Sequence, residues 1–226
     1  MKRELYLTAD GSHTIALPDM QVTYHSTYGA LQESNHIYIQ AGLLEQMRRT
    51  SEKIHVFEMG FGTGLNALLS VQAAISHKRP VYYQAVETDP ISTEEAAKLN
   101  YSSQLINSQN TFSLLHSSAW EEDTSINRFF TLHKSQDSIT RVQVDKHFHV
   151  IYYDAFAPDI QPELWEPAIF EKLYNWLYPE GCIVTYCCKG SVRRMMQSVG
   201  FRVEKLAGPP GKREILRGNK ASLTEK

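Results

Sequence analysis

The stretch IHVFEMGFGTGLNALLSVQAAI, residues 54–75, decides the fold class. Its first part, Ile54–Met59, is a short apolar run that predicts a buried strand. Its last part, Leu65–Ile75, is apolar over too great a length for anything but a core helix. Between them, Gly60, Gly62 and Gly64 allow the backbone to turn sharply and to approach a ligand closely. The stretch therefore predicts a strand, a ligand-binding loop and a helix in succession.

The same alternation of strands and helices continues toward the C-terminus, which favours an α/β fold with a largely parallel sheet. The last two predicted strands are joined by Gly208–Gly211, a tight connection that suits an antiparallel hairpin. A parallel sheet ending in such a hairpin is typical of Rossmann-like, class I methyltransferases. The predicted strands are 81–87, 112–116 (the weakest), 147–154, 182–187, 201–206 and 213–216, and the predicted helices are 92–100, 167–177 and 190–198.

Toward the N-terminus, residues 1–53 do not follow this alternation. We expect them to form an extension with strands of its own, among them 35–40, attached to a Rossmann-like core of residues 54–226. The length of 226 residues suits a single domain, 1–226. The polar stretch 121–140 predicts a surface loop.

Composition narrows the class of protein. Three cysteines crowded near one segment form no disulfide framework, and no His or Cys spacing resembles a zinc site. No apolar run approaches the roughly 20 residues that a membrane-spanning helix needs, and the N-terminus lacks a secretory signal. We therefore expect a cytoplasmic protein without a metal.

The net charge of −2 conceals an uneven distribution. Residues 189–226 hold ten Lys and Arg against three acidic residues, an excess of seven positive charges, whereas the rest of the chain has an excess of nine negative charges. Such asymmetry predicts either an interaction surface or a solvated basic tail.

The glycine loop and two acidic residues indicate the cofactor class. The glycine spacing is not that of a dinucleotide-binding loop, and no P-loop lysine follows. Glu58, just before the loop, would repel a pyrophosphate but attract a cationic amino group, which S-adenosylmethionine carries without any phosphate. Glu87, at the end of the next strand, is placed to accept hydrogen bonds from ribose hydroxyls. The alternative is a tight turn with two surface acids.

Asp154–Pro158 follows the strongest of the later strands, where an open parallel sheet binds its ligands. The segment resembles the Asp/Asn-Pro-Pro-Tyr/Phe loop of amino-methyltransferases. A carboxylate there can orient an amine and accept its proton, and Phe156 can stack on a base. The alternative for Asp154 is a structural cap at the end of a strand.

Four segments together resemble the methyltransferase domain of the MnmC family of tRNA wobble-uridine modification enzymes, found alone as MnmD-type proteins. The resemblance spans about residues 20–217. It implies methyl transfer from S-adenosylmethionine to the exocyclic amine of 5-aminomethyl-2-thiouridine at the tRNA wobble position. With 226 residues we expect no flavin domain, and another enzyme then supplies the amine. The matching segments are 28–36, 57–66, 154–158 and 208–214.

The resemblance also implies roles for individual residues. The cofactor site would comprise Glu58, Gly60, Gly62, Gly64, Asn66 and Glu87, with Asp154 as the catalytic residue facing the amine. Substrate contacts would come from Glu33, His36, Phe156, Pro158, Lys212 and Arg213, the last two holding the backbone of the tRNA anticodon stem-loop or serving only the fold. Ser117–Trp120 replaces the Gly-Asp pair that relatives carry near adenine, and Trp120 is then a candidate cofactor contact.

Two other functions remain open at this point. A small-molecule amine methyltransferase or an aminopropyltransferase-like enzyme would share the glycine loop and Asp154, but would have no use for the basic tail. A catalytically silent RNA-binding module would keep the fold, but would not need an intact loop.

Overall fold

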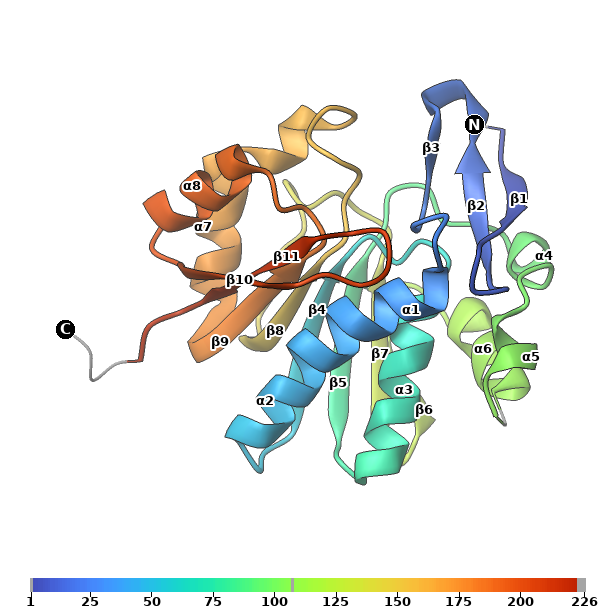
Figure 1. The fold of residues 1–226 in the computed structure, drawn as a ribbon. Helices are drawn as coiled ribbons and strands as arrows, with labels where there is room; N and C mark the ends of the chain where they lie inside the picture. The colour runs from blue at the N-terminus through green and yellow to red at the C-terminus, as the bar shows by residue number, and fades with distance from the viewer. Residues whose placement is uncertain (1, 107, 223–226) are drawn as a thin grey trace.

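The computed structural model describes residues 2–106 and 108–222, and they are built around an eight-stranded mixed sheet in the order β10-β11-β9-β8-β4-β5-β7-β6. The five strands from β9 to β7 are parallel, whereas β6, β11 and β10 pair antiparallel with their neighbours. The expected α/β fold with a C-terminal antiparallel hairpin is confirmed (Figure 1). The strands are β4 (Ile54–Met59), β5 (Val81–Val86), β6 (Asp123–Asn127), β7 (Phe130–Ser135), β8 (Phe148–Tyr153), β9 (Leu177–Thr185), β10 (Arg202–Ala207) and β11 (Glu214–Asn219).

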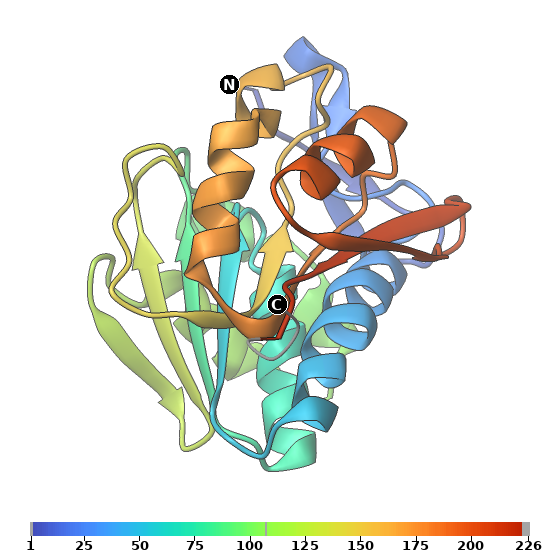
Figure 2. The same cartoon turned by 90° about the vertical axis from the view of Figure 1, so that its left-hand side faces the viewer.

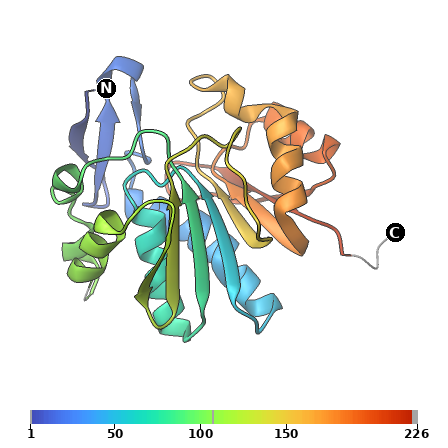
Figure 3. The ribbon, with the colours of Figure 1, turned by 180° about the vertical axis from the view of Figure 1, so that it is seen from behind.

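Helices cover both faces of the sheet. Alternate residues of each central strand point to opposite faces, so each face packs into a hydrophobic core of its own. Val56 and Tyr152 point into a core shared with α3 (Leu65–His77), whereas Phe57 and Tyr153 point into a second core shared with α7 (Pro167–Trp176) and α8 (Gly190–Ser198). Figures 2 and 3 show α3 and α7 on opposite sides of the sheet. The predicted start of α7 at Pro167 and both predicted ends of α8 are confirmed.

The N-terminal residues form a separate three-stranded antiparallel sheet, β1 (Glu4–Leu7), β2 (His13–Leu17) and β3 (Val22–Thr23), linked by the 3-10 turn η1 (Pro18–Met20). It lies apart from the main sheet, near the end where the core strands finish (Figure 1). Arg3 ties it to the loop after β5, donating to the Asp89 carbonyl at 2.6 Å and to Glu95 at 3.0 Å.

The predicted strand at 35–40 is wrong, because those residues lie in a continuous helical segment from Ala30 to Arg49. It comprises α1 (Ala30–Ser34), the π-helical η2 (Asn35–Leu43) and α2 (Leu44–Arg49). The aromatic and β-branched residues of this segment favour a strand locally, but tertiary packing on the sheet outweighs this local preference. Gly42 permits the close approach, since a Cβ there would lie 3.1 Å from Val184 and 3.2 Å from Tyr152.

Two further corrections concern the third parallel strand. Residues 112–116, predicted as a strand, lie in helix α6 (Gln109–Ser117), and the predicted loop 121–140 contains the β6–β7 hairpin. Phe112 and Leu115 are buried three residues apart, a helical spacing that a short apolar run does not reveal by itself. The buried positions of β7 include Lys134, whose charge hid the strand pattern.

The remaining helices are short; two of them lie between β5 and α6, and one follows β8. The capping box at Ser92 is present, but the helix it opens, α4 (Thr93–Ala96), ends earlier than expected. It is followed by α5 (Tyr101–Gln104), and η3 (Pro162–Trp165) precedes α7. Among the described residues, no helix combines the length and apolarity needed to cross a membrane.

Candidate active site

The glycine loop between β4 and α3 has a backbone that only glycine adopts without strain. Gly60, Gly62 and Gly64 have φ values of +88°, +50° and +72°. A Cβ at Gly64 would also lie 2.9 Å from His116 Nε2, whose ring contacts the loop carbonyl of Thr63 at 3.1 Å. The sharp glycine turn that the sequence pattern predicted between strand and helix is therefore present.

A cavity of about 330 Å³, here called the first cavity, lies against this loop. Its walls come from the loop itself, the residues after β5, β7 and β8, and the N-terminal sheet through Leu17, Tyr24 and His25. Five acidic residues line it and none of its lining residues is Lys or Arg, so it suits a cation and disfavours a phosphate. The five acids are Glu87, Asp89, Asp137, Asp154 and Glu163.

Glu87 is fixed in this cavity by backbone N–H groups. Its Oε2 accepts a hydrogen bond from the Gly62 amide at 3.0 Å, and its Oε1 accepts from Thr88 at 2.8 Å and Asp89 at 2.9 Å. The carboxylate thus connects the glycine loop to the end of β5.

Not all the residues expected to bind the cofactor line the first cavity. Gly60, Gly62, Asn66 and Glu87 do. Glu58 instead lies inside the core, 1% exposed, where burial raises the pKa of its carboxyl well above the ordinary value. Burial thus favours the neutral form of the Glu58 carboxyl, and this side chain does not line the first cavity.

Trp120 lies outside the first cavity as well. It follows helix α6 rather than a strand, and its ring packs over Lys134 Nζ at 4.7 Å. Lys134 in turn donates to the carbonyls of Leu115 at 2.9 Å and His116 at 3.1 Å, which caps the end of α6. The loop that does follow the third parallel strand contains Asp137 and Ser138, and both line the cavity where Trp120 was expected to contribute.

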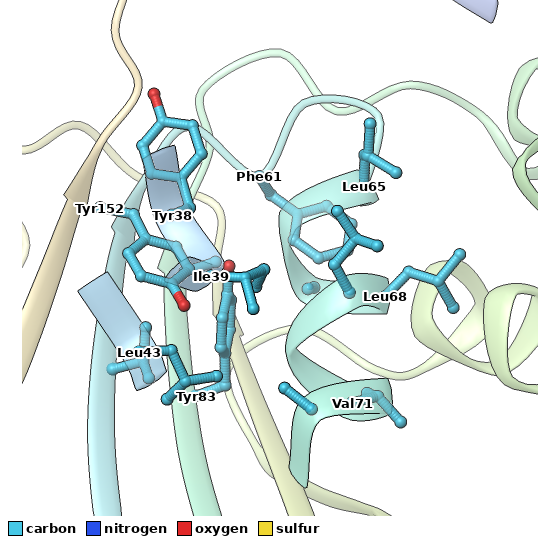
Figure 4. Close-up of a cluster of buried hydrophobic side chains, with 14 of the residues drawn as sticks. Tyr38, Ile39, Leu43, Phe61, Leu65, Leu68, Val71, Tyr83 and Tyr152 are labelled. Atoms are coloured by element: carbon cyan, nitrogen blue, oxygen red, sulfur yellow. The ribbon is translucent and has the colours of Figure 1, made fainter. Parts of the chain in front are cut away.

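Asp154, at the end of β8, has both carboxylate oxygens held by side chains. Tyr38 Oη donates to Oδ1 at 2.6 Å, and Asn66 Nδ2 donates to Oδ2 at 2.9 Å. Burial raises the pKa of Asp154 from 3.8 to about 7, and these two hydrogen bonds oppose that rise. Tyr38 belongs to the buried cluster of Figure 4, where its hydroxyl points away from Leu43 and Tyr83.

A second cavity of about 150 Å³ meets the first at Asp154 and Phe156. It adds Glu33, Tyr186 and Lys212 to the lining. Lys212 Nζ lies 3.3 Å from Glu33 Oε1 and 4.7 Å from the centroid of the Tyr186 ring. Asp154 therefore faces two adjoining spaces, one against the glycine loop and one that contains an ion pair.

Three expected substrate contacts lie outside both cavities. His36 Nε2 bonds the carbonyl of Ala207 at 2.7 Å, joining the N-terminal helical segment to β10. Pro158 is half-buried beyond Phe156, and Arg213 is exposed at the hairpin turn. Sequence reasoning also missed Tyr38, because the predicted strand concealed the helical face that carries it.

Part of the basic tail serves the fold. Arg217 donates to the carbonyl of Ala41 at 3.2 Å and to Glu204 at 2.9 Å, and Lys220 bonds the carbonyls of Tyr174 and Leu177, both at 2.8 Å. Glu225 and Lys226, counted in the tail charge, lie outside the described residues. Lys212 is the tail residue that lines the second cavity.

Comparisons with known proteins agree with this geometry. Residues 123–221 match a family model described as S-adenosyl-L-methionine-dependent methyltransferase. The tRNA 5-methylaminomethyl-2-thiouridine biosynthesis bifunctional protein MnmC of Burkholderia mallei is 29% identical over 226 aligned positions, covering 91% of this chain and 34% of the relative. The chain thus spans about a third of the length of the curated relatives it matches.

Two solved structures resemble the whole fold. MNMC2 from Aquifex aeolicus matches with a TM-score of 0.77 and 23% identity, covering 99% of this chain and 71% of that one. Spermidine synthase from Thermotoga maritima matches with a TM-score of 0.60 and 15% identity, covering 97% and 69%. The chain has the fold of class I S-adenosylmethionine-dependent methyltransferases, and over most of its length it is related in sequence to one part of the MnmC proteins.

Proposed function

We propose that the protein transfers a methyl group from S-adenosylmethionine to the exocyclic amine of 5-aminomethyl-2-thiouridine at the wobble position of tRNA, giving 5-methylaminomethyl-2-thiouridine. The observation that carries the proposal is the position of Asp154, where the first and second cavities meet. The identity of the proposed substrate is taken from the names of the sequence relatives.

The first cavity fits S-adenosylmethionine by its charge. A ligand with a sulfonium and an ammonium group, a ribose and no phosphate matches a lining with five acids and no Lys or Arg. Glu87 would accept from the ribose hydroxyls, and Asp137 and Ser138 would lie on the adenine side. When bound, this molecule supplies the methyl group for the reaction.

The second cavity would hold the target base, with Asp154 positioned for its amine. An alkyl ammonium has a pKa near ~10, so the amine arrives protonated and is attracted to a carboxylate. Glu33 is already paired with Lys212 at 3.3 Å, which leaves Asp154 as the carboxylate available to the amine. With a pKa of about 7, Asp154 can accept the proton that the nitrogen must lose and release it to water near neutral pH.

Fixed geometry would contribute further. Tyr38 and Asn66 prevent the carboxylate from rotating, so the amine is oriented toward the first cavity. The ring of Phe156, held against Tyr24 with centroids 5.6 Å apart, provides a wall on which a flipped base can stack. Lys212 and Arg213 would contact the phosphates of the anticodon stem-loop.

The proposed reaction also indicates which step this chain would carry out. The chain would transfer a methyl group to an amine already present on the base, which a separate enzyme would supply.

Mass spectrometry of tRNA nucleosides tests the proposal. The tRNA comes from cells that cannot complete this modification and is incubated with the protein and S-adenosylmethionine. We expect one added methyl on 5-aminomethyl-2-thiouridine with the wild type and a large loss of product with Asp154→Asn. Methylation of free polyamines or nucleosides alone, with tRNA unchanged, would instead identify a small-molecule amine methyltransferase.

A further inference from the structure

A third space opens beside the second cavity, on the side of the N-terminal sheet. This groove, of about 530 Å³, runs between the β2–β3 connection and the residues that follow β8 and β9. Its inner wall is formed by Phe156 and Tyr186, and Tyr6 on the edge strand β1 forms part of its outer wall.

The groove is continuous with the proposed target-base site. Thr23, Phe156 and Tyr186 line both the groove and the second cavity. A base in the second cavity therefore has the groove as its immediate neighbour, with the Phe156 ring between them. The groove is also the larger space, about 530 Å³ against about 150 Å³.

The lining has the chemistry of a stacking site. None of the residues that line the groove is charged, and three of them are aromatic. The two inner rings are fixed, because Tyr186 Oη donates to the Ala155 carbonyl at 2.9 Å and Phe156 packs edge-on against Tyr24. The outer ring, Tyr6, is 46% exposed, a large apolar surface that no intramolecular contact covers fully.

The ammonium group of Lys212 lies near the junction of the groove and the second cavity. Lys212 Nζ lies 4.7 Å from the centroid of Tyr186, one of the two rings that both spaces share. A phosphate that links a nucleotide in the second cavity to one in the groove would pass near this ammonium. Phosphate contacts of this kind fix the register of a nucleic acid without reading its sequence.

From this arrangement we infer that the groove binds the base of a nucleotide next to the target nucleotide, stacked on Tyr6. The inference rests on the proposed function, because it assumes an RNA substrate with an unpaired loop. Single-stranded bases stack on aromatic side chains with little dependence on sequence, which agrees with an uncharged groove that offers three rings. The N-terminal sheet then takes part in substrate binding.

Two synthetic anticodon stem-loops test the inference, each with 5-aminomethyl-2-thiouridine at the wobble position and fluorescent 2-aminopurine on one or the other side of it. Wild type and Tyr6→Phe should quench one of the two probes. Tyr6→Ala should abolish the quenching and raise the KM for the RNA about 5- to 100-fold, the range expected for loss of one base–aromatic stack.

Leu7→Ala is the matched control. Leu7 is on the same strand, is more exposed at 62%, and does not line the groove. It should leave both readouts as in the wild type, and calorimetry should show unchanged S-adenosylmethionine affinity for all variants. The inference is overturned if Tyr6→Ala leaves the KM and the quenching unchanged, or if Leu7→Ala changes them equally. In either case, methylation by the wild type still upholds the proposed function. Failure of the wild type to methylate either RNA overturns both.

Discussion

Removing the hydroxyl of Tyr38 should raise the pKa of Asp154 and shift the pH dependence of catalysis. In the folded protein the Tyr38 hydroxyl donates to Asp154 Oδ1 at 2.6 Å and favours the ionised carboxylate. A hydrogen bond to a charged group contributes roughly 1.5–3 kcal/mol, which corresponds to about one to two pKa units. Tyr38→Phe should therefore raise the pKa of Asp154 from its present value of about 7 by that amount.

The assay is kcat/KM for methyl transfer between pH 6 and pH 10. The reaction requires ionised Asp154 and a protonated amine, so the plot of kcat/KM against pH is bell-shaped. The rise on its acid side reports the pKa of Asp154 in the free enzyme. In Tyr38→Phe this limb should move up by about one to two pH units, with activity at pH 7 about 5- to 50-fold lower and largely recovered at higher pH.

The control is Tyr152→Phe, which removes another buried hydroxyl from the same cluster. The Tyr152 hydroxyl bonds Ser70 at 3.2 Å and does not contact Asp154, so the acid limb should stay in place. If Tyr38→Phe lost activity equally at every pH, or shifted its limb no more than Tyr152→Phe does, Tyr38 would contribute packing alone and the account of Asp154 would be wrong.

Three other predictions concern the cofactor site, acid stability and RNA binding. Glu87→Ala should weaken S-adenosylmethionine binding at least tenfold by calorimetry, since it removes a ribose contact and the acceptor of the Gly62 amide; affinity within twofold of the wild type would remove Glu87 from the cofactor site. Burial lowers the pKa of both His25 and His116 from 6.5 to about 4. The stability that depends on their neutral forms is therefore fully present above pH 6.5. As the pH falls from 6.5 toward 4 this contribution to the free energy of unfolding, up to about 3 kcal/mol for each histidine, is lost. Urea unfolding at pH 7 and pH 4.5 measures that loss, and equal stabilities would contradict it. Lys212→Ala with Arg213→Ala should reduce tRNA affinity and flatten its salt dependence, whereas an unchanged salt slope would leave these residues without a phosphate contact.

The sequence predicted the parallel core well where local and tertiary preferences agree. The apolar run at Ile54–Met59, the glycine loop and the C-terminal hairpin follow patterns that packing reinforces. Prediction failed where a buried charge interrupts the pattern. Lys134 is 1% exposed in β7, and its ammonium is satisfied by helix carbonyls that no sequence window could identify. Missing that strand placed the loop after it at Trp120 instead of Asp137.

Tertiary packing also explains why only some residues of the candidate site could be predicted from the sequence. Residues of the Rossmann-like core, such as Glu87 and Asp154, follow strands and could be placed by topology alone. Two of the groups around Asp154 come from the N-terminal residues: Tyr38 bonds its carboxylate, and Glu33 pairs with Lys212. Their positions depend on a helix whose contacts with the sheet override its local preference for a strand. A core of this kind is common to the fold, so we expect the preference for one amine over another to depend on the N-terminal residues that complete the second cavity.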